Sequence, residues 1–174
     1  MSLDFDIHES NLIKDVWILR PSVNEDLRGN IWTSFLKDEV EKLIPENLYF
    51  KHDKFSSSKK NVLRGIHGDV KSWKLVTCVF GEILQVVVDL REGSSTYLKW
   101  QSFKIDSNNL QSVLIPPRMG NAYYVSSENA VYHYKLAYSG NYLDAEDQFS
   151  FKWNDERIGI DWPVSSPILS FRDR

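Results

Sequence analysis

Residues that could move a proton to and from carbon stand at three separated places in this chain. An Arg-Gly-Ile-His segment that reads as a strand ends at His67, Tyr134 lies far downstream, and Asp173 comes one residue before the last. A histidine has an unperturbed pKa near 6.5 and can act as a base at neutral pH when a neighbour fixes its tautomer. A base, a carboxylate partner and a phenolic acid are the minimum set for taking a proton off one face of a carbon atom and returning one to the other.

Gly65 decides whether the two polar side chains around it can act at one place. In a regular strand His67 shares a face with Gly65, and Arg64 points the other way. A β-bulge at Gly65 would let Arg64 and His67 reach the same cavity. Spacing alone leaves both arrangements open, and a histidine after a glycine is more often structural or exposed.

The other candidates also have a structural and a functional interpretation. Tyr134 falls on an aromatic strand face that packs a core or lines a ligand cavity, and Asp173 would ordinarily be a solvated residue of the tail. Most basic side chains only solvate a surface, but a phosphate-bearing ligand needs local positive charge. The candidate phosphate contacts are Arg28, Lys54, Arg64, Lys74, Arg91 and Arg118.

Cysteine and histidine usage argues against thiol and metal chemistry. The single Cys78 lies in an apolar, strand-like run, which favours a small buried hydrophobe over a catalytic thiol. The nearest approach to a His-x-His metal pair is His67-Gly68-Asp69. We therefore expect no metal site.

Length and composition indicate one domain spanning residues 1–174, with 42% hydrophobic and 13% aromatic residues to fill its core. The net charge of −3 gives no reason to expect nucleic-acid or membrane partners. We expect no signal peptide at the acidic start and no transmembrane helix, since no apolar run approaches about 18 residues. A lone cysteine suits the reducing cytoplasm, which is the expected location.

Strand signals dominate the chain, and aromatic residues favour strands over helices. Alternation predicts strands over 74–80, 82–91, 98–105, 111–115 and 130–138, with a tight hairpin or bend at Gly81. Residues 56–61 read as a short polar loop. A helix is expected only over Lys37–Ile44, which Pro45 follows. The expected fold is therefore all-β, as a sandwich, barrel or jelly roll, with a few short helices.

The order of these motifs resembles the nucleotide-diphospho-4-keto-sugar epimerases, the family of dTDP-4-dehydrorhamnose 3,5-epimerase. The similarity runs from about Asp26 to Asp173. It includes Asp26-Leu27-Arg28-Gly29, Ser56-x-Ser58, Val62-Leu63-Arg64-Gly65-Ile66-His67, Lys74-Leu75-Val76, Gly81-Glu82-Ile83, Val88-Asp89-Leu90-Arg91, Ile115-Pro116-Pro117, Tyr134-Lys135, Ile158-Gly159-Ile160-Asp161-Trp162-Pro163 and Leu169-Ser170-x-x-Asp173. Each piece is weak alone, but their order and spacing together are specific.

The resemblance implies a cupin-type jelly roll and a role for each candidate. His67 would be the base, Asp173 its orienting carboxylate and Tyr134 the acid on the opposite face. Lys74 would stabilise the enolate oxygen that forms when a proton leaves a carbon beside the C4 ketone. The family needs no redox cofactor or metal, and it is typically a homodimer with exchanged N-terminal strands.

The resemblance also implies contacts to a nucleotide-sugar substrate. Arg28 and Arg64 would hold the diphosphate and sugar, because arginine's planar fork suits phosphate oxygens. Arg28 would serve the neighbouring subunit's site, and Tyr138 would pack against sugar or nucleotide.

Several positions depart from the family pattern in segments expected to touch the ligand. Asn121 stands where the family has a histidine, and an asparagine cannot take up a proton at neutral pH. His52 and Lys54 replace a Gln and an Asn, and Gly68-Asp69 replaces Tyr-Gln. The pattern resembles more the epimerases that act on GDP-linked 4-keto-6-deoxy-heptoses in surface (capsule) polysaccharide biosynthesis.

The expected function is therefore a cofactor-independent epimerase that inverts C3, with or without C5, of a nucleotide-linked 4-keto-6-deoxy sugar. Three alternatives stay open. The enzyme could invert C3 only, it could be a ketoisomerase that moves the carbonyl between C3 and C4, or the chain could be a sugar-nucleotide-binding cupin without catalysis.

Overall fold

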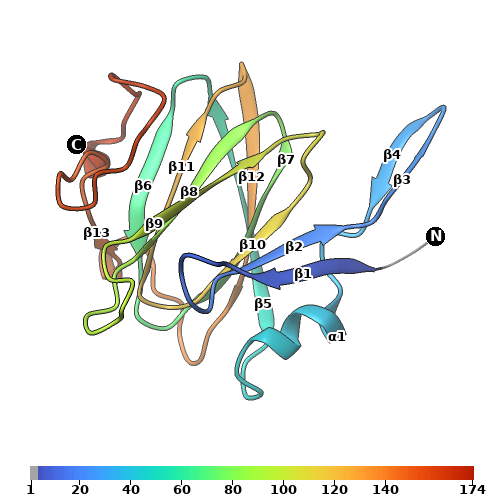
Figure 1. Ribbon diagram of the computed structural model, residues 1–174, viewed down its shortest axis with the longest axis horizontal. Coiled ribbons are helices and arrows are strands. Elements are labelled where there is room, and N and C mark those ends of the chain that lie inside the picture. The colour runs from blue at the N-terminus through green and yellow to red at the C-terminus, as the bar shows by residue number, and fades with distance from the viewer. Residues whose placement is uncertain (1–3) are drawn as a thin grey trace.

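Two antiparallel β-sheets face each other in the computed structural model, which describes residues 4–174 (Figure 1). The large sheet has the spatial order β1 (Phe5–Glu9), β2 (Trp17–Pro21), β10 (Ser112–Ile115), β7 (Trp73–Phe80), β12 (Asn129–Ala137) and β5 (Phe50–Lys59). The small sheet has the order β13 (Phe149–Ser150), β6 (Leu63–Gly68), β11 (Met119–Val125), β8 (Ile83–Asp89) and β9 (Trp100–Ile105). The all-β prediction is confirmed.

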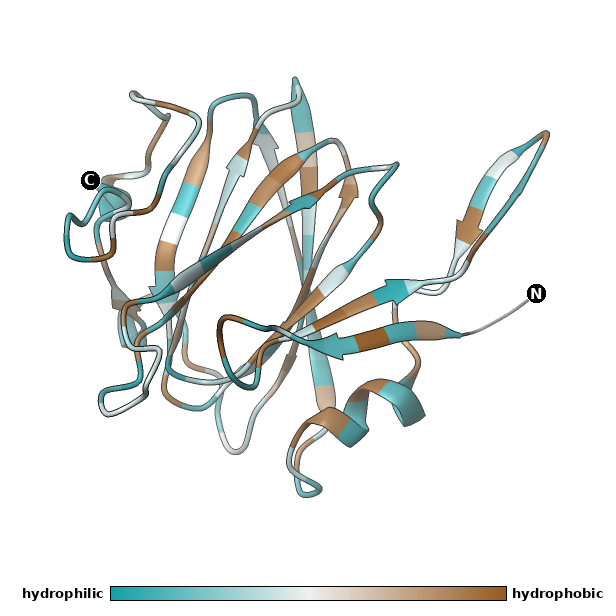
Figure 2. Cartoon of the chain, in the orientation of Figure 1, coloured by the Kyte–Doolittle hydropathy of each residue, from teal (hydrophilic) through white to brown (hydrophobic). Residues whose placement is uncertain are grey.

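The main core fills the space between the two sheets. Val76 and Val113 of the large sheet pack there with Ile83, Val87 and Val125 of the small sheet, all of them fully buried. The alternation predicted for β8 is confirmed, because Val86 and Val88 belong instead to a second cluster on the outer face. Figure 2 shows hydrophobic and hydrophilic residues alternating along the small sheet, which is what a strand with two different faces requires.

A hairpin of β3 (Val23–Asp26) and β4 (Gly29–Trp32) projects away from the two sheets (Figure 1). The Leu27 side chain at its tip is fully exposed, and Ile31 is about half exposed. Within residues 4–174 this hairpin pairs with neither sheet.

Helix is scarce and short. The helix expected over 37–44 is divided into α1 (Lys37–Val40) and a 3₁₀ turn η1 (Glu41–Leu43), and its buried residues Val40 and Ile44 pack under the large sheet. Two more 3₁₀ turns, η2 (Ala145–Asp147) and η3 (Phe171–Asp173), follow near the C-terminus. No helix within residues 4–174 is long and apolar enough to span a membrane.

Gly81 makes a bend between the sheets and not a hairpin. β7 belongs to the large sheet and β8 to the small sheet, so the two strands do not pair. Gly81 has φ +85°, and a Cβ there would lie 2.2 Å from the carbonyl oxygen of Asn129. The corner therefore requires both glycine's conformational freedom and its lack of a side chain.

The expectation of a polar loop over 56–61 is wrong for most of that segment. Residues 56–59 are the end of β5, and only Lys60 and Asn61 form the turn. Serine and lysine are not typical strand residues, so propensity does not predict a strand here. In the structure alternate residues of this strand face a cavity, where serine hydroxyl groups can form hydrogen bonds. Ser58 is buried and Ser56 is hydrogen-bonded on that side.

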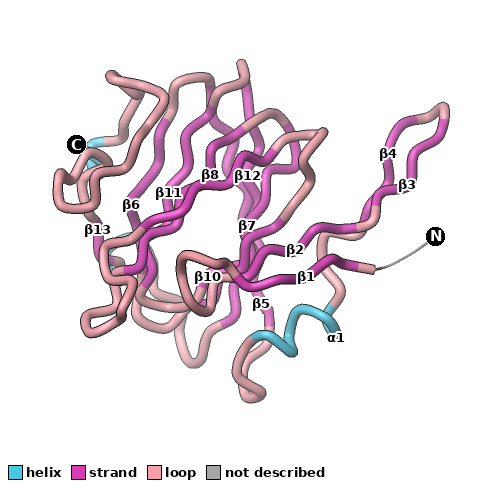
Figure 3. The backbone as a smooth tube through the Cα atoms, in the orientation of Figure 1, coloured by secondary structure: helices cyan, strands magenta, loops and turns pink. Residues whose placement is uncertain are grey.

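The chain after β13 forms a C-terminal strap, residues 151–173, along the outer face of the small sheet. Figure 3 draws nearly all of it as loop. Phe151 exchanges two backbone hydrogen bonds with Ile66 of β6, and Ile168 exchanges two with Asn61 and Leu63. Ile158 and Trp162 pack into the outer cluster with Val86 and Val88. The strap thereby brings the C-terminal residues to the edge of β6.

Candidate active site

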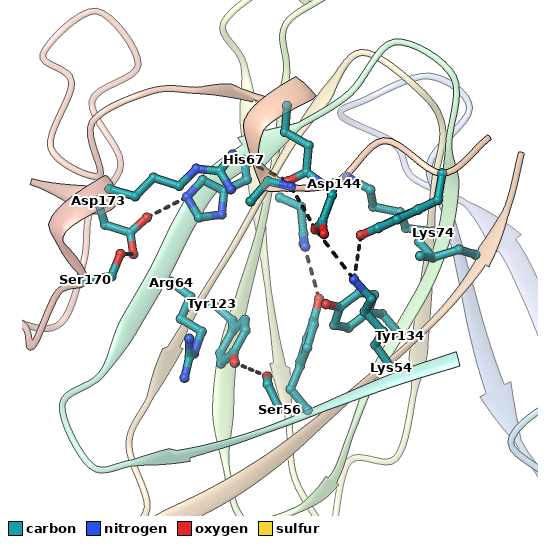
Figure 4. A pocket seen from close by; sticks show the side chains of 17 residues that line it. Lys54, Ser56, Arg64, His67, Lys74, Tyr123, Tyr134, Asp144, Ser170 and Asp173 are labelled. Atoms are coloured by element: carbon teal, nitrogen blue, oxygen red, sulfur yellow. Dashed lines mark hydrogen bonds and ion pairs between the residues drawn. The ribbon is translucent and has the colours of Figure 1, made fainter. Parts of the chain in front are cut away.

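A cavity of about 310 Å³ opens between the two sheets and gathers most of the predicted residues (Figure 4). Its walls come from both sheets, from the strap and from the segment between β12 and β13. The lining residues are Lys54, Ser56, Arg64, His67, Lys74, Asn121, Tyr123, Tyr132, Tyr134, Leu136, Tyr142, Asp144, Ala145, Gln148, Ser170, Arg172 and Asp173.

The bulge proposed at Gly65 is present. β11 pairs Asn121 with His67 but Tyr123 with Arg64, so β6 holds one extra residue at this point. Gly65 has φ +116°, and a Cβ there would lie 2.6 Å from both Ala122 Cβ and the Asn121 carbonyl oxygen. Because of the bulge, Arg64 and His67 both line the cavity.

The strap places Asp173 beside the imidazole of His67. Asp173 Oδ1 lies 2.5 Å from His67 Nε2, and Ser170 Oγ donates to Oδ2 over 2.6 Å. The two atoms are at hydrogen-bonding distance, although the Nε2–H bond does not point along the line to Oδ1. Since the carboxylate occupies the Nε2 side, Nδ1 is the ring nitrogen left to take a proton from a ligand.

The charge on Asp173 is stabilised although the side chain is almost completely buried. Burial raises the pKa of this carboxyl, but the interactions with His67, Ser170 and the Gly65 backbone N–H outweigh it and hold the pKa below its ordinary value. His67 keeps about a quarter of its side chain exposed toward the cavity. The pair therefore combines a fixed anion with an accessible base.

Tyr134 reaches the cavity from the opposite sheet. It lies on β12, where Tyr132, Tyr134 and Leu136 line the cavity while His133 and Lys135 bond to Asp53 on the outer face. The alternation that predicted a strand over 130–138 thus separates a cavity face from an outer face. Burial raises the pKa of the Tyr134 phenol, and Lys54 opposes that effect, so the phenol is protonated at neutral pH and has a cation near it.

Lys74 of β7 is a buried cation at the cavity wall. Its Nζ lies 3.2 Å from Asp69 Oδ2, and the Asp69 side chain is fully buried behind it. Burial lowers the pKa of Lys74, Asp69 opposes this effect, and Arg172 adds to it.

Two hydrogen-bonded groups form the rest of the cavity wall. Tyr123 Oη bonds Ser56 Oγ over 2.6 Å, and Arg64 Nε donates to Ser58 Oγ over 3.0 Å. Farther along β11, Asn121 Oδ1 accepts from Gln85 Nε2 over 2.6 Å, and the buried Tyr132 hydroxyl donates to Gln85 Oε1. Gln85 is fully buried and supports Asn121 from inside the core.

The segment between β12 and β13 covers one side of the cavity. Lys54 Nζ donates to the Tyr142 hydroxyl over 3.0 Å, lies 4.2 Å from the centre of that ring, and is 3.9 Å from Asp144. Lys71 Nζ donates to the Asn141 carbonyl. Two lysines thus fix this segment from different sides.

Not every predicted contact residue lies at this cavity. Arg28 is on the projecting hairpin, where it bonds Asp26 and has 89% of its side chain exposed. Tyr138 lies just beyond β12, bonds His52 Nδ1 and packs near Tyr142, but it does not line the cavity. Arg91 instead pairs with Asp89 and Asp15.

Several lining residues carried little or no signal in the sequence. Tyr132 shares a strand face with Tyr134, so its position could be found by alternation. Arg172 adjoins Asp173, but nothing in the strap predicts that its side chain turns toward the cavity. Tyr142 and Asp144 lie in irregular chain whose path no periodicity encodes.

Comparison with known proteins identifies the family. A family model described as dTDP-4-dehydrorhamnose 3,5-epimerase matches residues 10–174. The chain belongs to this family. It is therefore an enzyme of the isomerase class, as predicted.

Individual members of the dTDP-4-dehydrorhamnose 3,5-epimerase family resemble this chain along most of its length. One from Salmonella typhimurium is 39% identical over 165 residues, which are 92% of this chain and 88% of that protein. A dTDP-4-dehydrorhamnose 3-epimerase from Streptomyces niveus is 34% identical over 165 residues, which are 93% of this chain and 78% of that protein. The crystal structure of the dTDP-6-deoxy-D-glucose-3,5-epimerase of Legionella pneumophila, in complex with dTDP-4-keto-L-rhamnose, superposes with a TM-score of 0.88 at 32% identity, covering 98% and 90%. These matches confirm the predicted cupin-type fold.

The remaining titratable side chains form no recognisable metal or thiol centre in the part of the chain described. No group of three or more His, Cys, Asp or Glu side chains within residues 4–174 is arranged to hold a metal ion. Cys78 is buried, and burial raises the pKa of its thiol to about 11. The thiol is therefore protonated at neutral pH.

Proposed function

We propose that this enzyme inverts C3 of a nucleotide-diphospho-4-keto-6-deoxy sugar, and C5 as well when the bound sugar can turn in the cavity. One observation carries the proposal. The His67–Asp173 pair enters the cavity from the small sheet and its strap, while Tyr134 enters from the large sheet. A base and an acid on opposing walls are what inversion of a carbon centre requires.

The reaction begins with the hydrogen on the carbon next to the C4 ketone. His67 Nδ1 takes that proton, and Asp173 stabilises the resulting imidazolium. The electron pair of the C–H bond moves into the carbonyl and leaves an enolate, whose oxygen is stabilised by the Lys74 ammonium.

The second step returns a proton to the opposite face. Tyr134 gives its phenolic proton to the carbon, the carbonyl reforms, and the phenolate that remains is stabilised by nearby Lys54. Exchange with solvent then restores His67 and Tyr134. The cycle consumes no oxidant and leaves the substrate's composition unchanged, except that one hydrogen is exchanged for a hydrogen from solvent.

The charge of the cavity supports a diphosphate ligand. Lys54, Arg64 and Arg172 line it together with Lys74, against the carboxylates of Asp144 and Asp173. Guanidinium groups bind phosphate oxygens in pairs, and the relatives' names and ligands specify dTDP sugars. A dTDP-linked 4-keto-6-deoxy sugar is therefore the first substrate to test.

A narrower proposal is a GDP-linked 4-keto-6-deoxy-heptose, used for surface polysaccharide. It is supported by the residues that depart from the pattern that we expected for the family. Lys54 and Asn121 both line the cavity, and Asp69 stands directly behind Lys74. A changed set of hydrogen-bonding groups at these positions favours a changed sugar.

Deuterium exchange tests the function and separates the alternatives. The enzyme is incubated in heavy water with dTDP- and GDP-linked 4-keto-6-deoxy sugars, and products are read by NMR. We expect deuterium at C3 with inversion there. Deuterium at C3 alone identifies a C3-only epimerase, a new 3-keto product identifies a ketoisomerase, and binding without exchange identifies a non-catalytic protein.

We also propose a homodimer with exchanged N-terminal strands, in which Arg28 serves the neighbouring cavity. The support is a hairpin that projects from its own chain with Leu27 and Arg28 exposed. Co-expression of R28A and H67N subunits tests this arrangement. Each variant alone should be inactive, and mixed dimers should regain activity at the site that keeps His67 and receives the intact Arg28. No recovery in purified mixed dimers would rule out action between subunits.

A further inference from the structure

Asp69 is a buried carboxylate that does not line the cavity but contacts a residue that does. It follows β6 directly, its side chain is fully buried, and its Oδ2 lies 3.2 Å from Lys74 Nζ. Oδ1 accepts from the backbone N–H groups of Lys71 at 3.0 Å and Ser72 at 2.6 Å. Each oxygen therefore has a separate task, one in the turn and one toward the lysine.

Lys74 needs a nearby anion to remain an ammonium at this place. Burial lowers its pKa, and Arg172 of η3 adds a like charge from the strap. Two other carboxylates line the cavity, but Asp173 is held by His67 and Ser170, and Asp144 lies 3.9 Å from Lys54 Nζ. The remaining ionisable groups there are cations, tyrosines and His67, so Asp69 is the carboxylate that the described structure pairs with Lys74. Asn121 and Gln85 at the neighbouring wall are neutral amides bonded to each other.

We propose that Asp69 is a positioning residue for the epimerisation, whose carboxylate keeps Lys74 protonated and directed at the place where the substrate's carbonyl oxygen becomes an enolate. The inference rests on the proposed function, because it takes Lys74 as the enolate's partner. Asp69 acts only through Lys74 and touches no reacting atom.

The substitution D69N isolates this role. An asparagine is the same size, and its carbonyl oxygen can replace Oδ1 as the acceptor for the Lys71 and Ser72 N–H groups. That pairing directs the NH₂ group at the ammonium of Lys74 in place of a carboxylate oxygen. The turn is thus preserved and only the charge facing Lys74 is lost.

The expected result is a change in pH dependence that structural damage would not produce. An opposite charge at this range shifts a pKa by roughly 1–3 units, and each unit changes the charged fraction about tenfold. The rate of deuterium exchange at C3 in D69N should therefore begin to fall at a lower pH than in the wild type. The ratio of variant to wild-type rate should fall as the pH rises from 6.5 to 9, by up to about tenfold for each unit by which the pKa of Lys74 is lowered, and D69E should restore the wild-type profile in part.

A second measurement does not need substrate. The ¹³Cε chemical shift of Lys74, assigned with K74R, is followed against pH in wild type and D69N, and its midpoint should be lower in D69N. Asp155 supplies the matched control, because it has the same arrangement outside the cavity. Its Oδ1 accepts from the Arg157 N–H over 3.0 Å and its Oδ2 pairs with the Arg157 guanidinium, so D155N should change neither profile.

The outcomes separate this inference from the proposed function. No exchange by the wild-type enzyme with any 4-keto sugar would refute the proposed function, whatever the lysine titration shows. Normal wild-type exchange, with superimposable pH profiles and an unchanged Lys74 midpoint in folded D69N, would refute the role of Asp69. Circular dichroism and thermal melting of D69N, D69E and D155N establish that each variant is folded.

Discussion

Replacing Asp173 by asparagine tests the His67–Asp173 pair most directly. Ser170 Oγ donates to Oδ2 over 2.6 Å, while Oδ1 lies 2.5 Å from His67 Nε2. An asparagine that keeps its oxygen toward Ser170 turns its NH₂ group to Nε2. Nε2 then becomes the acceptor and the ring proton moves to Nδ1, which leaves no lone pair to take the proton from the substrate.

The size of the effect follows from this change of tautomer. Positioned general bases contribute about 10²–10⁴-fold, and the same Asp-to-Asn change in a Ser-His-Asp triad lowers kcat about 10⁴-fold. We expect D173N to slow deuterium exchange at C3 by about 10³–10⁴-fold, or roughly 4–5 kcal/mol in activation free energy. Affinity for dTDP should change little, because binding of the nucleotide does not depend on which nitrogen of His67 carries the proton.

Single-turnover exchange in heavy water, with H67N and the double variant as references, is the appropriate assay. His67 and Asp173 act as a unit, so the double variant should be no slower than H67N alone. A D173N exchange rate within tenfold of the wild-type rate would refute the reasoning. So would a double variant whose loss of rate equals the product of the losses in the two single variants. Folding provides a control, since the lowered pKa of Asp173 gives stability that is present above its ordinary value and lost as pH falls through its folded value. D173N should therefore be less stable than the wild type at pH 7 and equally stable at low pH.

Three further results are expected. Y134F keeps the ring and removes the phenolic proton, so epimer formation should fall about 10²–10⁴-fold. NMR should still show deuterium entering the recovered substrate, because His67 can remove and return a proton on its own face. Loss of both epimer formation and deuterium exchange would contradict separate roles for His67 and Tyr134. D89N should lower the free energy of unfolding at pH 7 by about 2 kcal/mol. Burial opposes the Asp89 charge, but Arg91, Ser94 and Thr96 lower the pKa of that carboxyl from 3.8 to about 2. This stability is present above pH 3.8 and lost toward pH 2, so urea unfolding should show the two proteins converging there, and a constant difference would exclude this origin. G65A places a Cβ 2.6 Å from Ala122 Cβ at a residue with φ +116°. The substitution should lower the free energy of unfolding by about 1–3 kcal/mol and slow deuterium exchange. An unchanged melting temperature would show that the bulge tolerates a side chain at this position.

Local sequence patterns predicted those features of the fold that depend only on residues close together in the chain. Alternation assigned the two faces of β8 and β12. At Gly65 the sequence left a regular strand and a bulge both open, and the structure contains the bulge. The bend at Gly81 was located correctly, but whether the chain turned back or crossed to another sheet depends on pairing with distant strands. β5 was not predicted, because its serines contact a cavity and are not typical of strands.

The site required information that no local pattern holds. Nothing near Asp173 shows that it meets His67, because the approach is made by a strap with almost no regular structure. Only similarity of motif order suggested this pairing, and also the importance of Lys74. In the sequence, Asp69 was noted only as a departure from the family pattern. Its contact with Lys74 depends on how the chain after β6 packs against β7, which the sequence does not show.

The strap has a consequence for the order in which the protein becomes active during folding. Asp173 and His67 are separated by 173 − 67 = 106 positions, and closing so long a loop is entropically costly, so such contacts tend to form late. The core between the two sheets is built from residues that precede the strap, so the sheets can be assembled before the strap lies along β6. Refolding molecules would then pass through a stage with packed sheets, an unpartnered histidine and an incomplete cavity wall, because Ser170, Arg172 and Asp173 belong to the strap. Recovery of catalysis would therefore trail packing of the sheets. Activity would thus report that the final segment of the chain is in place.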